Sequence, residues 1–335
     1  MNQNDSSVRW QSLTSRYASP DIGRSIWQVV NTVIPFVGMW VLMYYSLRVG
    51  YWLTLLLAFP TAGLMVRIFI LFHDCCHASF FKSSGANEIT GFMLGLLVLT
   101  PFYQWKHDHA IHHATCADLD RRGVGDIMTL TVAEYVNLPW FKRLGYRILR
   151  NPWFLFPLGS TLNFLILHRL YSPSAGKREQ ESVLWTNAVL TGLVIILMKL
   201  IGWQAIVMVE LPVLMIASSL GVWLFYVQHN FEGTYWARHS QWDFFKAGLI
   251  GSSYYKLPAV INWFTGDIGY HHIHHLGPRI PNYKLAQAYR ENILFQIPPL
   301  SVVRSFKSLG YRLWDEDNKV MAGFGILRSY HAKVM

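Results

Sequence analysis

The sequence has few charged residues. Asp, Glu, Lys and Arg together make up 14% of its 335 residues, against roughly a quarter in an ordinary soluble domain. Apolar residues make up 52% and aromatic residues 15%. This composition argues against an ordinary water-soluble enzyme and indicates a membrane protein, in which Trp and Tyr gather at the bilayer interface. The formal net charge is +10. In so apolar a chain we expect the basic residues on the cytoplasmic side of a membrane, and no nucleic-acid partner.

Cysteine is also scarce. The three cysteines, Cys75, Cys76 and Cys116, show no CxxC spacing, which excludes a disulfide framework and a zinc ribbon and favours reduced thiols in the cytosol. Residues 1–25 are polar and lack the apolar core and cleavage site of a signal peptide, so we interpret them as a cytosolic arm.

Four apolar runs are each long enough to cross a hydrocarbon layer of about 30 Å as a helix. These runs are residues 26–47, 51–72, 183–201 and 205–227. Short turns near Gly50 and Gly202 group them into two hairpins. Arg67, near the end of the second run, is expected to extend toward the interface.

Two further apolar stretches do not qualify as spans. Residues 89–102 are too few, and residues 153–167 are broken by Pro157, so we expect re-entrant or interfacial helices there. No repeat or linker divides the chain. The sequence therefore predicts one domain, 1–335, with an all-α integral-membrane fold of four transmembrane helices and a helical cap.

The basic residues support one orientation. Of the 29 Lys and Arg, 26 lie before the first run, between residues 74 and 182, or after residue 228. In a two-hairpin protein with both termini cytosolic, these three stretches share one face. The positive-inside rule makes that face cytosolic.

Histidine is clustered, since ten of the 14 fall in three short segments. The first segment is His73-Asp74-Cys75-Cys76-His77, whose two histidines lie on one face of a helix. Taken alone, such a pair is equally compatible with capping helix carbonyls or facing lipid headgroups.

The other two clusters are more specific. Each places three imidazoles at i, i+3 and i+4, on one helical stripe, and such a stripe beside lipid is costly unless every ring has a partner. The two stripes are His109, His112, His113 and His271, His274, His275. His229, at the end of the fourth run, completes a set of nine. Five histidines fall outside this set: His107, His168, His239, His272 and His331.

The ligand type alone does not choose the metal, because imidazole suits Zn, Cu, Fe and Ni. A structural zinc takes four ligands, usually with thiolates, and haem takes one or two. A di-iron centre that reduces O2 accounts for a larger set. Nearby carboxylates are candidates to orient the imidazoles through their free N–H groups. They are Asp74, Asp108, Asp118, Asp120 and Asp267.

The order of these motifs resembles that of the membrane fatty acid desaturases, in particular the acyl-lipid type related to the omega-6 and omega-3 enzymes. The matching segments are HDCCH from His73, HAIHH from His109, Gln228-His229 and HHIHH from His271. The phrases DLDRRGVGD from Asp118 and HHLGPRIPNY from His274 also resemble bacterial members, and the resemblance covers residues 72–286. Cys76 departs from the commoner HDC-Gly-H and adds bulk beside the site.

The resemblance implies an O2-dependent enzyme that removes two hydrogens from adjacent carbons of a lipid-linked acyl chain, giving a cis double bond and water. It implies two irons, electrons from a separate donor protein such as ferredoxin, and a bacterial inner membrane with the active site in the cytosol. The implied iron ligands are His73, His77, His109, His112, His113, His229, His271, His274 and His275.

Two alternatives remain at this point. A hydroxylase or ketolase acting on an alkane, a carotenoid or a lipid would share the iron site. A metal transporter or sensor would use the histidines for binding alone, but it should place its ligands within the spans near the membrane midplane. Here the histidines gather at the ends of the spans, which favours an enzyme.

Overall fold

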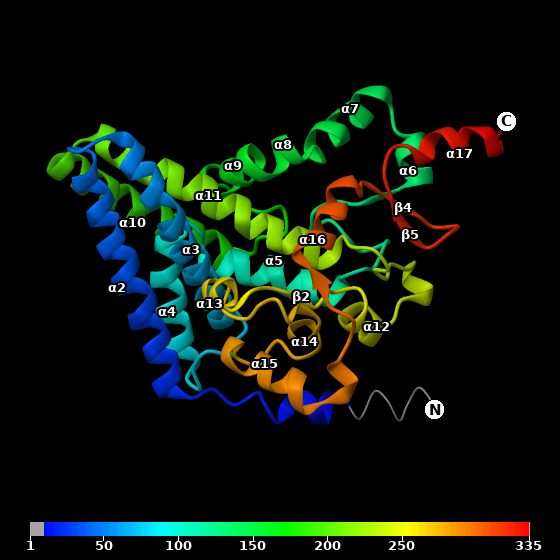
Figure 1. Ribbon diagram of the computed structural model, residues 1–335, viewed down its shortest axis with the longest axis horizontal. Coiled ribbons are helices and arrows are strands. Elements are labelled where there is room, and N and C mark those ends of the chain that lie inside the picture. The colour runs from blue at the N-terminus through cyan, green and yellow to red at the C-terminus, as the bar shows by residue number, and fades with distance from the viewer. Residues whose placement is uncertain (1–9, 335) are drawn as a thin grey trace.

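The computed structural model describes residues 10–334, and most of that stretch is helical (Figure 1). Residues 1–9 of the expected N-terminal arm lie outside the described residues. Four helices are long and apolar enough to cross a membrane, as the sequence predicts. They are α2 (Ile22–Ser46), α3 (Tyr51–Cys76), α10 (Lys177–Ile201) and α11 (Trp203–His229).

These helices are longer than the apolar runs that predict them. A helix continues through polar residues as long as each backbone N–H finds its i−4 carbonyl, so hydropathy alone does not mark its end. At the ends nearest the histidines, α3 continues to Cys76 and α11 continues to His229. His73 and His229 are therefore held on regular helix.

The starts and turns of the long helices have local causes. The Asp21 carboxylate accepts the backbone N–H of Arg24 at 2.9 Å and caps α2. Gly202, with φ of 81°, joins α10 to α11 in a conformation that favours glycine.

Helix α3 is the central element of the long helices, since it packs against both α2 and α11 (Figure 1). The interface combines small and apolar side chains with a few buried polar contacts, such as the hydroxyls of Ser46 and Thr54 at 2.7 Å. Its fully buried members include Met43, Ala58, Ala62, Val209 and Val213.

The expectation that Arg67 extends to the interface is wrong. Its side chain is 3% exposed and lies inside the protein, where its Nε donates to Thr32 Oγ1 at 3.0 Å and its Nη1 donates to the carbonyl of Trp263. Internal acceptors therefore replace the water or headgroup that a snorkelling arginine would seek.

Helices α4 (Ser84–Leu97) and α5 (Phe102–Thr115) follow α3 and meet at an angle of 100°. They lie where the sequence predicts a re-entrant or interfacial helix. The bend needs glycine at two positions, because a Cβ on Gly91 would lie 2.1 Å from the ring of Phe102, and one on Gly95 would lie 2.6 Å from the carbonyl oxygen of Thr100. The bend brings α5 across the end of α3.

A row of short helices runs beside α11 (Figure 1). Pro157 lies in its π-helical turn, where the ring's missing N–H removes a normal α-helical bond. The row comprises α7 (Trp140–Leu149), α8 (Pro152–Phe154), the π-turn η1 (Leu155–Gly159), α9 (Ser160–Leu165) and η2 (Leu167–Arg169), whereas the preceding α6 (Val132–Asn137) lies apart from it, against α17 (Ile326–Val334).

The remaining chain forms the lower and right part of Figure 1 and covers the ends of α3, α5 and α11. Its helices are η3 (His239–Gln241), α12 (Phe244–Leu249), α13 (Ala259–Phe264), α14 (His271–Leu276), α15 (Asn282–Glu291), η4 (Ile293–Phe295), α16 (Val302–Ser305), η5 (Phe306–Gly310) and α17 (Ile326–Val334).

The prediction of a purely helical fold is incomplete, because two small sheets tie distant loops together. In one, β1 (Leu130–Thr131) runs parallel to β4 (Leu313–Asp315), which pairs antiparallel with β5 (Val320–Ala322). In the other, β2 (Tyr255–Lys256) runs parallel to β3 (Leu300–Ser301). Strands of two or three residues carry no periodicity that a sequence could reveal.

Candidate metal centre

The nine predicted histidines converge from α3, α5, α11 and α14 and form two groups. In the first group the ring nitrogens lie within 4.8 Å of one another. The Nε2 atom of His113 is 3.1 Å from Nε2 of His109 and 3.1 Å from Nε2 of His274. The first group consists of His73, His77, His109, His113 and His274.

The second group lies on the other side of α5. His112, His229 and His275 lie within the same 4.8 Å limit. His271 joins them, since its Nε2 atom is 3.0 Å from Nε2 of His229 and 3.1 Å from Nε2 of His275. The groups touch where the rings of His113 and His275 stack, with centroids 4.2 Å apart.

Helical geometry explains why each HxxHH motif serves both groups. Residues at i and i+4 share a face, whereas i+3 lies on the flank of that face. In α5, His109 and His113 therefore point to the first group and His112 to the second. In α14 the roles are reversed, with His271 and His275 in the second group and His274 in the first.

Several outer ring nitrogens are held by acceptors. His112 Nδ1 contacts the carboxylate of Asp126, His229 Nδ1 lies 3.3 Å from the carbonyl oxygen of Gly251, and His73 Nδ1 lies 3.4 Å from Asp74. An imidazole that donates from Nδ1 keeps its lone pair on Nε2, and these Nε2 atoms point inward.

Burial also favours the neutral form of six imidazoles outside the spans. Burial first, and neighbouring imidazoles next, hold the pKa of these six rings well below the ordinary histidine value. The six are His77, His109, His113, His271, His274 and His275. A neutral imidazole is the form that binds a metal.

The donor set fits a cation in each group. The Nε2 atom of His113 lies 3.1 Å from Nε2 of both His109 and His274, and a ring nitrogen carries either one proton or one lone pair, so it cannot pair fully with both. In addition, Nε2 of His77 and Nε2 of His112 are buried and have no hydrogen-bond partner among the described residues, and such orphaned atoms are costly. A bound metal ion would satisfy both conditions.

Cys116 approaches the second group but stands behind it. Its Sγ is 3.5 Å from Nδ1 of His229, whereas the opposite nitrogen of that ring faces His271. Burial raises the pKa of the Cys116 thiol. Because the sulfur faces the outer nitrogen of His229, we do not count Cys116 as a ligand, although its sulfur lies within 4.8 Å of nitrogens of the second group.

Cys76, expected to add bulk beside the site, directs its side chain into the protein core. Its side chain is buried with Cys75 in the main hydrophobic cluster, among residues of α3, α4 and α11. It belongs to neither histidine group.

The five aspartates named as candidates have different roles. Only Asp74 contacts a histidine of the two groups, and its other oxygen accepts the backbone and side-chain N–H groups of Asn282 at 2.8 and 2.9 Å. Asn282 in turn accepts from Gln28 of α2 at 2.9 Å. This buried chain ties α2 and α15 to His73.

The other four candidates bind elsewhere. Asp108 accepts from Ser172 and Ser174, Asp118 and Asp120 lie beside His239 and Arg238, and Asp267 faces Arg67. Sequence reasoning missed Asp126. The available signal was the phrase DLDRRGVGD, which ends at Asp126.

The histidines outside the set are placed apart from it or point away from it. His272 is buried but points to the carbonyl oxygen of Phe295 at 2.8 Å. His168 lies between Thr100 and Asn163, and His239 contacts Asp118 at 2.7 Å. His107 belongs to neither group, and the side chain of His331 lies outside the described residues.

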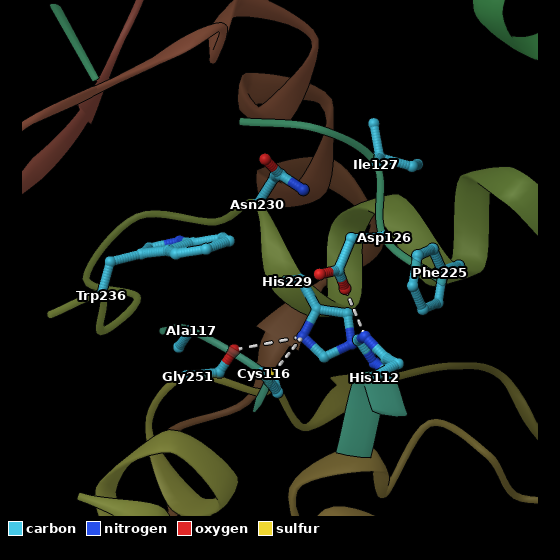
Figure 2. A pocket seen from close by; sticks show the side chains of 10 residues that line it. All are labelled: His112, Cys116, Ala117, Asp126, Ile127, Phe225, His229, Asn230, Trp236 and Gly251. Atoms are coloured by element: carbon cyan, nitrogen blue, oxygen red, sulfur yellow. Dashed lines mark hydrogen bonds and ion pairs between the residues drawn. The ribbon is translucent and has the colours of Figure 1, made fainter. Parts of the chain in front are cut away.

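A narrow pocket opens beside the second group (Figure 2). It has room for about one water molecule. Its walls include Asp126, Trp236 and Phe225, with the rings of His112 and His229 at its base. The indole N–H of Trp236 is buried there without a partner among the described residues. The pocket gives small polar molecules access to the outer side of these two rings.

Buried imidazoles form a candidate metal centre at the ends of helices that are long and apolar enough to cross a membrane. The chain belongs to the fatty acid desaturase family, whose sequence profile matches residues 49–304. The match is wider than the stretch that the motifs indicate. The protein is therefore an enzyme, an oxidoreductase of lipid metabolism.

The relatives fall in bacteria and plants. A fatty acid desaturase of Bacillus subtilis is 46% identical over 313 residues, which cover 93% of this chain and 89% of the relative. An endoplasmic-reticulum omega-3 fatty acid desaturase of Vigna radiata is 29% identical, over 69% of this chain and 63% of the relative. An sn-1 acyl-lipid omega-3 desaturase (ferredoxin) of Synechocystis is 28% identical, over 66% of this chain and 62% of the relative.

Proposed function

We propose that the chain is an O2-dependent acyl-lipid desaturase, which places a cis double bond in an acyl chain carried by a membrane lipid. The observation that carries this proposal is the pair of adjoining, buried histidine groups in a chain of the desaturase family. The acyl-lipid substrate and the separate ferredoxin donor are inferred from the name of the Synechocystis relative.

We infer that each histidine group holds one iron. The first would be bound by His73, His77, His109, His113 and His274, and the second by His112, His229, His271 and His275. When bound, the two irons would supply the O2 reduction and C–H cleavage that no side chain offers.

The protein's own part is to hold the ligands and exclude water. Asp126 and the Gly251 carbonyl keep a proton on Nδ1 of His112 and His229, so that Nε2 stays free to bind. His112 and His274 are at most 1% exposed. A dry site protects a reactive centre from side reactions with solvent.

The proposed placement follows from charge and helix length. The four long helices form two hairpins across a bacterial inner membrane, and the rest of the single domain 1–335 forms a cap on the cytosolic side. Both termini lie on that side. This arrangement places 26 of the 29 Lys and Arg on the cytosolic face, as the positive-inside rule requires.

The decisive experiment is product analysis. The chain is expressed with ferredoxin and its reductase in a host that makes only saturated acyl chains, and double bonds are located by mass spectrometry. We expect an alkene at one fixed position. His274→Ala should abolish it, whereas His239→Ala, at a ring bound to Asp118 outside the groups, should not. Mainly hydroxylated acyl chains, or an oxidised carotenoid or alkane with unchanged acyl chains, would refute desaturation.

A second measurement tests the metal assignment independently of activity. Purified protein should contain about two irons per chain, because nine imidazoles exceed the needs of one ion. His109→Ala and His112→Ala each remove a ligand from a different group, and each should lower the iron content toward about one per chain. Full iron retention in both variants would contradict the assignment.

A further inference from the structure

Helix α13 lies deep beside the span α3. Its sequence, Ala259–Phe264, is apolar except for Asn262. The ring of Phe264 packs so closely on Gly63 that a Cβ there would lie 2.8 Å from it. Gly63 precedes His73 by about 15 Å along α3, at 1.5 Å per residue. Helix α13 therefore lies against the middle of α3, well away from the end of α3 that carries His73.

Arg67 anchors this helix. It donates to the carbonyl oxygen of Trp263, and its guanidinium lies 4.3 Å from the centroid of the Trp263 ring. Carbonyls in the last turn of a helix lack intrahelical partners, so Arg67 caps the C-terminal end of α13. Its bond to Thr32 ties the same contact to α2.

A second short helix, α16, begins close to the start of α13. Strands β2 and β3 pair side by side, with Lys256 opposite Ser301, and each leads into one of the two helices. Phe306, directly after α16, packs against Trp223 of α11 with ring centroids 5.8 Å apart. Helix α13 thus lies against α3, and the residue that follows α16 lies against α11.

Together these helices expose an apolar surface, here termed the α13–α16 surface. Val260 is 68% exposed, Val303 is 80% exposed and Phe306 is 58% exposed. Facing water, such side chains would be costly as a group. The members of the surface are Val260, Ile261, Trp263, Val302, Val303 and Phe306.

Basic side chains border this surface. Lys256, Arg304 and Lys307 are exposed. Lys307 pairs with Glu232 at 3.1 Å, whereas Lys256 and Arg304 have no ion pair within residues 10–334. Apolar side chains flanked by unpaired cations are typical of a segment that lies in the interface of an anionic bilayer.

We propose that the α13–α16 surface enters the bilayer leaflet on the histidine side and binds anionic phospholipid, with Lys256 and Arg304 contacting the phosphate. The occupant is lipid because α13 packs on α3 at Gly63, within about two helical turns of the exposed apolar side chains of Leu56 and Phe59. This proposal rests on α3 crossing the membrane. It does not rest on the metal or on the reaction.

Spin labelling of the full-length protein in lipid nanodiscs tests the insertion. The spin label is attached at Val303→Cys, and Gln241→Cys in the exposed helix η3 is the control. The native cysteines are buried, so the label attaches at the introduced cysteine. The label at position 303 should be relaxed by dissolved oxygen and shielded from a water-soluble nickel complex, and the label at position 241 should show the reverse. Equal access of the nickel complex to both positions would overturn the proposal. So would strong spin–spin coupling between two copies at position 303.

Headgroup selectivity tests the cationic border. Spin-labelled phosphatidylglycerol should be immobilised by the protein in preference to spin-labelled phosphatidylcholine. Lys256→Gln and Arg304→Gln should each lower that preference by about fivefold, whereas Lys319→Gln, on the exposed β4–β5 turn, should not. An unchanged preference in the double variant would remove the anionic-lipid site. Neither measurement depends on iron or turnover. The lipid-binding proposal and the proposed desaturase function can therefore fail independently of each other.

Discussion

At His112, the ring nitrogen that faces away from the other imidazoles is held by the carboxylate of Asp126. A carboxylate in this position fixes the orientation of the ring and strengthens it as a metal ligand. Asp126 lies 14 residues after His112, on the loop that follows α5. The second histidine group therefore depends on a carboxylate that no helix positions.

Asp126→Ala should weaken metal binding by the second group about 10- to 100-fold. The first group keeps its ligands, so elemental analysis should show the iron content falling from about two toward one per chain. Asp120→Ala is the matched control, because Asp120 is an acidic residue of the same loop that pairs with Arg238 at the surface. Equal iron loss in both variants would show that the loop, and not the Asp126 carboxylate, is responsible.

At this scale the sequence predicts the clustered histidines better than the residues that orient them. Six of the nine histidines follow from the spacing i, i+3 and i+4, which brings side chains together on a helix whatever the tertiary fold. Asp126 obeys no such rule, because its place depends on how the loop 116–131 folds back over α5. Of the five aspartates expected to orient imidazoles, only Asp74 does so, and it adjoins His73 in the same helix.

Among the elements, the bend between α4 and α5 decides how the α5 histidines meet α3. A Cβ on Gly95 would lie 2.6 Å from the backbone oxygen of Thr100 and 3.1 Å from Phe72. Backbone cannot yield as a flexible side chain can, so any larger residue at position 95 pushes the two helices apart.

Gly95→Ala should therefore destabilise the protein by about 1–3 kcal/mol, the usual cost of overpacking. Gly85→Ala in the same helix is the control, since its Cβ would meet only Ser83 Oγ at 3.8 Å. That variant should be neutral or slightly stabilising, because alanine favours helix over glycine. Thermal unfolding midpoints in detergent compare the two. A midpoint for Gly95→Ala equal to that of the unaltered protein would argue against a tight bend.

The elements that sequence predicts best are the long ones. Four apolar runs yield four long helices, because a membrane-spanning helix needs about 20 consecutive apolar residues and few other structures contain so long an apolar run. Helix α13 was not predicted, since the run 257–264 is far below that length and a short apolar run has no preferred structure by periodicity. Its depth is set by contacts with Gly63 and Arg67, both distant in sequence.

On the scale of the whole molecule, the two histidine-bearing spans start at the same end. From Tyr51 to His73, α3 extends about 33 Å, close to the thickness of a hydrocarbon layer. Helix α11 begins at the Gly202 turn and carries His229 at its far end. Both groups therefore lie at the same end of these two long helices, and under the proposed placement an acyl chain must reach the membrane boundary to react.

This arrangement predicts the sidedness of the whole chain. Thiol-reactive probes that cannot cross the membrane should label Gln204→Cys, in the first turn of α11, from outside intact bacteria. Gln241→Cys and Gln296→Cys lie on the histidine side and should react only after the membrane is opened. All three positions are exposed, and the three native cysteines are buried, so the unaltered protein serves as the background. The reason is that the proposed two-hairpin placement assigns 26 of the 29 Lys and Arg to the face of positions 241 and 296, and moving them outward opposes the positive-inside rule. Labelling of Gln241→Cys from outside would invert the proposed orientation. Opposite behaviour of positions 241 and 296 would be more serious, because the chain segments that carry the histidines would then lie on different sides and could not build one centre.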